Sequence, residues 1–220
     1  MSGAFSEMVE ISLERAAMSK DLASLTDSLK TRNLQLQDAR RQLAEQATID
    51  EMTGLRNRRG VNIIINDELA RMKRMQLPIA VIALDVDHFK TYNDNYGHPA
   101  GDQVLQQLAN VMLEMTSRAG EFAARMGGEE FILFFPTVNR TAALELAEEL
   151  RMKVLGLKIP REMSLTAEYV SVSIGVISCV PEWELEFDAL LKAADDALYL
   201  SKTSGRNRVT CGELEANDQS

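Results

Sequence analysis

The 220-residue chain has few cysteines, fewer cations than anions and no long apolar run. Its two cysteines, Cys179 and Cys211, lack metal-site spacing and suit a reducing compartment, so we expect ordinary thiols. The formal net charge of −9 argues against nucleic acid or anionic membranes as partners, because those surfaces attract an excess of Lys and Arg. No apolar run approaches the ~20 residues that cross a bilayer, and Glu7 and Glu10 stand where a signal peptide carries cations. We therefore expect a cytoplasmic protein.

The first 48 residues lack proline and have almost no glycine or aromatic residues. Leucines recur there every seven residues, at Leu22, Leu29, Leu36 and Leu43. With these at heptad position a, position d is occupied by Ile11, Met18, Leu25, Arg32, Ala39 and Gln46. A seven-residue period favours a partner helix over a globular face, so residues 1–48 are predicted to form a coiled-coil dimerisation helix. A single amphipathic helix that packs on its own domain is the alternative.

Residues 49–211 alternate helical and strand patterns. Apolar stripes predict helices around residues 61–72, 104–115, 143–154 and 187–198, the first capped by Asn57 and ended by Pro78. The continuous apolar run 79–84 predicts a strand buried on both faces, and residues 121–126 and 130–135 predict a hairpin. Further strands are expected at 170–176, where Ser171 and Ser173 face away from the valines, and at 207–210. This order predicts an α/β domain, followed by a polar tail, 212–220, that we expect to be disordered.

The predicted hairpin contains the residues Gly127, Gly128, Glu129 and Glu130. Two glycines accept positive φ at both central turn positions and lack Cβ atoms, so a phosphate can approach the backbone closely. The turn then places two carboxylates beside that group. A plain type I′ hairpin with solvated acids is the alternative.

A carboxylate, Asp85, follows the buried strand 79–84, at the strand end where α/β sheets usually form their sites. Burying it without a partner is costly, and a divalent cation shared with Glu129 or Glu130 would compensate if the hairpin lies on adjacent strands. Oxygen ligands favour Mg²⁺ or Mn²⁺ over zinc. An aspartate that caps the next turn is the alternative, more so for Asp87 than for Asp85.

Residues 93–102 are rich in Asn, Asp and Gly and predict a shaped loop before a helix. Asn93 and Asp102 offer an amide and a carboxylate that match the edge of a purine such as guanine, although Asp102 also suits a helix N-terminus. Lys202 and Arg206 flank a predicted helix end, which suits phosphate. Helix termination by Gly205 explains that stretch equally well.

Four stretches together resemble the GGDEF domains of diguanylate cyclases. Residues 50–59 are similar to the family's D-x-L-T-G-L-x-N-R-R opening, with Met52 in place of Leu, and residues 85–102 follow D-x-D-x-F-K-x-x-N-D-x-x-G-H-x-x-G-D. Residues 127–131 give the signature loop in its GGEEF form, and residues 202–207 complete the set. The resemblance covers roughly residues 50–210. It implies a palm-like α/β fold, with a central, largely antiparallel sheet flanked by helices.

The resemblance also implies roles for individual residues. Mg²⁺ would be bound by Asp85, the backbone carbonyl of Val86, Glu129 and Glu130. The substrate GTP would be bound by Phe89, Asn93, Asp102, Gly127, Gly128, Lys202 and Arg206. Glu129 is the candidate base for the ribose 3′-hydroxyl, and Lys90 would join the other cations in neutralising the triphosphate.

In this family each domain holds one GTP, and two domains facing each other form cyclic di-GMP and two pyrophosphates. Activity therefore implies a homodimer, which the coiled coil would supply, and an upstream sensory domain is expected that is missing from this chain. The alternatives are a catalytically silent GGDEF domain that binds GTP or cyclic di-GMP, and a coiled-coil scaffold with no enzymatic role.

The product-inhibition motif of the family, R-x-x-D, differs in this sequence. The matching residues are Arg118 and Glu121, so the carboxylate is one methylene farther from the backbone. We therefore expect inhibition by the product to be weaker than is usual in the family.

Overall fold

The computed structural model describes residues 18, 22, 26, 29–35, 37, 47–161 and 168–214, in two units divided after Ala47. The described residues of the first unit up to Gln37 are helical, and the side chains of Met18, Leu22 and Leu29 are exposed. Other predicted heptad positions lie outside the described residues: Ile11, Leu25, Leu36, Ala39, Leu43 and Gln46. Coiled-coil pairing therefore stays a prediction. None of the helices in the described part of the chain combines the length and apolarity of a membrane crossing.

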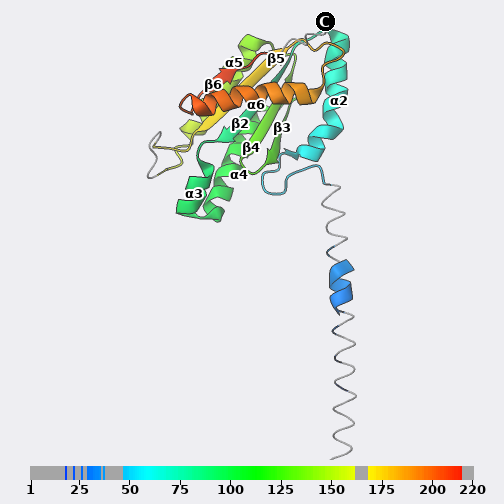
Figure 1. Cartoon of the computed structure of the whole chain (residues 1–220), viewed down its shortest axis with the longest axis vertical. Coiled ribbons are helices and arrows are strands. Elements are labelled where there is room, and N and C mark those ends of the chain that lie inside the picture. The colour runs from blue at the N-terminus through cyan, green and yellow to red at the C-terminus, as the bar shows by residue number, and fades with distance from the viewer. Residues whose placement is uncertain are drawn as a thin grey trace, which may run out of the picture. The chain divides into compact units, whose positions relative to one another are not determined.

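The second unit is built on a six-stranded sheet in the order β1-β3-β4-β2-β5-β6 (Figure 1). Its strands are β1 (Arg56–Asn57), β2 (Ile79–Val86), β3 (Phe122–Gly127), β4 (Glu130–Pro136), β5 (Val172–Cys179) and β6 (Val209–Cys211). The central strand β2 runs antiparallel to β4 and β5, and β3 and β4 form the antiparallel hairpin. Among the strands of the described residues, only the short edge strands β1 and β6 pair in parallel. The prediction of a largely antiparallel sheet is confirmed.

Helices cover both faces of this sheet. They are α2 (Arg58–Met75), α3 (Phe89–Tyr96), α4 (His98–Met115), α5 (Arg140–Gly156) and α6 (Phe187–Thr203). Ala80, Ile82 and Leu84 of β2 pack in one core with α3, α4 and α5, whereas Ile79 and Val81 pack in the other with α2 and α6. Every residue of β2 is buried, which explains its unbroken apolar run.

One predicted helix boundary is confirmed and one needs correction. Asn57 caps α2 as predicted, with its side chain accepting a hydrogen bond from the Gly60 amide at 2.9 Å, and α2 ends at Met75, three residues before Pro78. The loop predicted over residues 93–102 is wrong, because α3 and α4 occupy it and are separated only by Gly97, with φ +82°. Phe89 and Tyr92, three residues apart and both buried, anchor α3 to the core, a stripe that the polar composition concealed.

Candidate active site

Asp85 lies at the carboxyl end of β2, directly opposite Glu130 on β4 and Ser173 on β5. It is 7% exposed, and its Oδ2 lies 2.8 Å from the Nζ of Lys202 at the end of α6. Burial raises the pKa of Asp85, and the charges of Glu129 and Glu130 raise it further, against the lowering effect of Lys202. The ionised carboxylate is thus only partly compensated by the protein, and further positive charge at this position would stabilise it.

The β3–β4 turn consists of Gly128 and Glu129, because Gly127 pairs with Glu130 at its base. Of the two turn residues only Gly128 has a positive φ, +51°. The predicted Gly127–Gly128 turn is therefore wrong, and the reason is a β-bulge between Arg125 and Gly127 that shifts the register. A Cβ added to Gly127 or to Gly128 would meet no atom within 4 Å, so the outer surface of the turn is open to an approaching group.

Arg125 is hydrogen-bonded to this turn, a contact that sequence reasoning missed. Its Nε donates a 2.9 Å hydrogen bond to the Gly128 carbonyl, and its Nη1 lies 3.3 Å from both carboxylate oxygens of Asp50. The Asp50 carboxylate also accepts hydrogen bonds from the Thr53 amide and hydroxyl, at 3.0 and 2.7 Å. Partial burial raises the pKa of Asp50, but the bonds from Thr53 and the Arg125 charge outweigh it and lower the pKa. The opening motif and the signature turn are thereby joined.

The corner between α3 and α4 places the Asn93 side chain against Gly101, the residue before Asp102. The Asn93 Oδ1 is buried and, within the part of the chain that the structure describes, has no hydrogen-bond partner. A Cβ at Gly101 would overlap this oxygen, so the glycine leaves the space that it needs. Asp102 follows Gly101 and is exposed. The Asn93 Oδ1, without a partner among the described residues, and the exposed Asp102 carboxylate can both accept hydrogen bonds, which suits a ligand edge that donates them.

Phe89, Lys90 and Arg206 lie around the start of α3 and the end of α6. Phe89 opens α3 with its side chain buried, whereas Lys90 in the same turn is exposed. The first-turn amides of a helix lack intrahelical partners and attract anions. Arg206 follows α6 in the left-handed region, with φ +63°, and is half-buried.

Asp87 does not cap α3, contrary to the alternative raised from the sequence. Its buried carboxylate accepts hydrogen bonds from the Ser171 and Ser173 hydroxyls, at 2.7 and 2.6 Å, and from the Asn207 amide at 3.0 Å. Both serines are buried, and sequence reasoning gave them no function. The available signal was a Ser-x-Ser pair in an apolar strand.

Arg118 and Glu121 form a turn between α4 and β3. The Glu121 Oε2 accepts a 3.0 Å hydrogen bond from the Arg118 backbone amide, and the Glu121 amide donates to the Arg118 carbonyl at 3.1 Å. Gly120 between them has φ +85°. The Glu121 carboxylate is thus bound within its own turn, while the Arg118 side chain is exposed.

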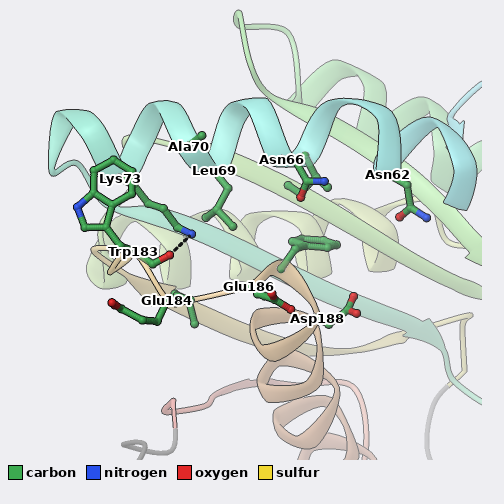
Figure 2. Close-up of a pocket in the computed structure, with 12 residues that line it drawn as sticks. Asn62, Asn66, Leu69, Ala70, Lys73, Trp183, Glu184, Glu186 and Asp188 are labelled. Atoms are coloured by element: carbon green, nitrogen blue, oxygen red, sulfur yellow. Dashed lines mark hydrogen bonds between the residues drawn. The ribbon is translucent and has the colours of Figure 1, made fainter.

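A separate hollow of about 630 Å³ lies between α2 and the segment that leads into α6 (Figure 2). The Lys73 Nζ donates a 2.8 Å hydrogen bond across it to the Trp183 carbonyl, and Glu184, Glu186 and Asp188 line one wall. It contains none of the predicted site residues.

Residues 47–208 match the family described as diguanylate cyclase, GGDEF domain. The chain belongs to the GGDEF-domain diguanylate cyclase family. The Response regulator PleD of Caulobacter vibrioides is 37% identical over 165 residues, which are 75% of this chain and 36% of PleD. The chain spans about a third of the length of the curated relatives that it matches.

Solved structures of GGDEF domains show the same fold. The coiled coil and GGDEF domain of DgcB from Caulobacter crescentus, in complex with c-di-GMP, matches with a TM-score of 0.68 at 33% identity, covering 86% of this chain and 98% of that one. The active GGEEF domain of a diguanylate cyclase from Vibrio cholerae gives a TM-score of 0.62 at 32% identity, covering 71% and 97%.

Proposed function

We propose that this chain is a Mg²⁺-dependent diguanylate cyclase that condenses two GTP into cyclic di-GMP and two pyrophosphates between two GGDEF domains. The observation that carries the proposal is Asp85, buried and incompletely compensated, opposite Glu130 of an intact Gly-Gly-Glu-Glu turn. The match to the active GGEEF domain from Vibrio cholerae supports it.

The metal site fits an ion that is partly bound by its substrate. Among the described residues, no three His, Cys, Asp or Glu side chains are close enough to hold a metal by themselves. Mg²⁺ typically takes one or two protein carboxylates together with substrate phosphates, which suits Asp85 and Glu130 on neighbouring strands, with Glu129 and the Val86 carbonyl beside them. Bound there, Mg²⁺ or Mn²⁺ would stabilise negative charge on the reacting phosphates.

The nucleotide would bind along the start of α3. The Asn93 Oδ1 and the Asp102 carboxylate accept hydrogen bonds from the N–H groups on the edge of guanine, and adenine does not present the same donors. Lys90, Lys202 and Arg206 neutralise the triphosphate, and the α3 amides together with the open Gly127–Gly128 backbone leave room for its oxygens.

Glu129 would accept the proton of the ribose 3′-hydroxyl. The freed oxygen forms a bond to the α-phosphorus of the facing GTP, the bond from that phosphorus to the bridging oxygen breaks, and pyrophosphate leaves. The 3′-hydroxyl of the second nucleotide then attacks the α-phosphorus of the first in the same way, and this second bond closes the ring. No covalent enzyme intermediate is required.

Because each domain binds one GTP, the reaction needs a homodimer. We assign dimerisation to the heptads of residues 1–48, of which Met18, Leu22 and Leu29 are exposed in the described helix of the single chain. The matching DgcB structure also contains a coiled coil with its GGDEF domain. Such a helix would raise the effective concentration of the second domain and would connect it to an upstream sensory domain. The free thiols of Cys179 and Cys211 suit a cytoplasmic location.

The test is incubation of the purified chain with GTP and Mg²⁺, and separately with ATP, followed by mass analysis of the nucleotides. Cyclic di-GMP from GTP alone is expected. GTP that binds without product would support the catalytically silent alternative, provided that the chain is shown to be dimeric under the same conditions. No binding of either nucleotide would contradict both readings.

A further inference from the structure

The loop that carries Arg206 has an unfavourable backbone. Gly205, Arg206 and Asn207 have φ angles of +114°, +63° and +46° in succession. Residues other than glycine persist in this region only where the surrounding structure holds them there. Something outside the loop must therefore fix its conformation.

Both the backbone amide and the side-chain oxygen of Asn207 are hydrogen-bonded. Its backbone N–H donates to the Asp87 Oδ2 at 3.0 Å, and its side-chain Oδ1 accepts a 2.7 Å hydrogen bond from the Nη1 of Arg151 on α5. The Arg206 amide donates to the Ser201 carbonyl at 3.0 Å, which closes the end of α6. The loop is thus tied to α5, α6 and the residue that follows β2.

Asp87 is the most firmly held of these anchors. It is 3% exposed; Ser171 Oγ donates to the same Oδ2 at 2.7 Å, and Ser173 Oγ donates to Oδ1 at 2.6 Å. The Asp87 amide donates to the Ser171 carbonyl at 2.9 Å. Neither the Ser171 hydroxyl, directly before β5, nor the Ser173 hydroxyl on β5 is left unsatisfied, and Asp87 cannot move without breaking its bonds to these two serines and to the loop at Asn207.

The charged groups around Asp87 also indicate that its carboxylate stabilises this corner of the domain. Arg161 is 6% exposed, and the positive charge of Arg206 acts on it. Burial lowers the pKa of His88, as do both guanidinium groups, and Asp87 opposes this effect. Without the Asp87 charge, Arg161 and Arg206 would repel each other in a poorly solvated corner.

We propose that Asp87 is a positioning residue that holds the loop 204–208 so that the Arg206 guanidinium faces the nucleotide phosphates. The choice of ligand rests on the proposed cyclase function, whereas the restraint of the loop does not. The two acids of the D-x-D motif thus have different roles. Asp85 is the proposed metal ligand, whereas Asp87 accepts hydrogen bonds from the protein.

The first test measures the loop without any nucleotide. Asp87→Asn keeps the shape but leaves one acceptor oxygen for three donors. Hydrogen exchange of the amides in residues 203–208 should be at least about tenfold faster than in the wild type, as expected when one hydrogen bond to a charged group is lost. Asp67→Asn, an exposed site on α2, removes the same charge and should leave the loop unchanged. Equal exchange in Asp87→Asn and wild type would overturn the proposal.

The second test measures binding with the α,β-methylene analogue of GTP, which cannot release pyrophosphate, and with guanosine. In Asp87→Asn the affinity for the triphosphate analogue should fall roughly tenfold, while that for guanosine should not change. Equal losses for both ligands would show a merely structural role and overturn the proposal. Neither test depends on turnover, so a chain without cyclase activity would contradict the proposed function and leave this inference to be decided on its own.

A milder variant covers the case in which Asp87→Asn does not fold. Ser171→Ala removes one donor from Oδ2 but leaves the carboxylate, and should accelerate exchange in the same loop by a few fold, with Ser171→Thr restoring protection through its hydroxyl. Loop exchange that is the same in the wild type and the alanine variant would contradict the proposal.

Discussion

Two sets of polar residues differ in how far the protein satisfies their charges and hydrogen bonds: the residues proposed to meet the nucleotide, here called the ligand face, and the residues that hold the neighbouring turn and loop, Asp50 and Asp87, here called the supporting layer. On the ligand face, Asp85 has a raised pKa with Lys202 as its partner, and the buried Asn93 Oδ1 has no partner among the described residues. In the supporting layer, Asp87 has three donors and Asp50 has a lowered pKa. A buried polar group that lacks partners gains free energy when a ligand supplies them, whereas a group whose partners are all in the protein fixes the local geometry. Changes to the first layer should therefore affect chemistry, and changes to the second should affect stability.

The largest expected effect is on the ligand face, at Glu129 in the turn. Glu129→Gln removes the proposed base and a metal ligand, and should lower turnover about 100- to 10,000-fold or to background. Glu114→Gln, on the exposed face of α4, is the matched control. Product formation is measured by mass, and folding and dimerisation by circular dichroism and light scattering. Retained activity would remove Glu129 from both proposed roles.

The next effect tests whether the space around Asn93 serves a ligand. Gly101→Ala would push a methyl group against the Asn93 Oδ1 and close to the Phe89 ring. We expect a raised KM for GTP and a loss of about 1–3 kcal/mol in the free energy of unfolding, as is typical of overpacking.

Gly156→Ala at the end of α5 is the control for Gly101→Ala. A Cβ there meets nothing within 4 Å, so the change should be neutral or slightly stabilising. If Gly101→Ala were equally harmless in both GTP kinetics and urea unfolding, the Asn93 acceptor would not depend on that space.

A smaller effect is expected in the supporting layer, at Asp50. Its pKa is lowered on folding, so its ionised form stabilises the domain above the pKa of the unfolded chain, and this contribution is lost as the pH falls through the lower folded value. Asp50→Asn should therefore cost about 1 kcal/mol near neutral pH and progressively less in acid.

Urea unfolding of the wild type and Asp50→Asn between neutral and acidic pH measures this difference, with Asp67→Asn as the control. A stability difference that does not change with pH would assign the role of Asp50 to its shape rather than to its charge.

The sequence predicts the ligand face better than the layer that supports it. The buried strand β2, the hairpin and Asp85 follow from local patterns: an apolar run, a pair of glycines and a carboxylate at a strand end. The supporting contacts join residues far apart in the chain: Ser171 is 84 residues from Asp87, Asn207 is 120, and Arg125 is 75 from Asp50. No local period reveals such pairs. The bulge before Gly127 likewise depends on tertiary register, so the turn lies one residue later than the glycine pair predicts.

The smallest expected effect concerns Glu121, which precedes β3 at the end of that strand away from the Gly128–Glu129 turn. In this chain the carboxylate bonds to the Arg118 amide of its own turn, so it is satisfied by the protein and poorly available to a product molecule. We expect weak inhibition by cyclic di-GMP in the wild type. Glu121→Asp shortens the side chain by one methylene, weakens this internal bond and should strengthen inhibition several-fold without changing the initial rate. Inhibition curves for the two proteins measure this directly. A wild type that is already strongly inhibited, with no further change in Glu121→Asp, would contradict this expectation. It would show that a carboxylate already bonded within the protein can still bind the product, so that the ligand face and the supporting layer could not be told apart by this criterion.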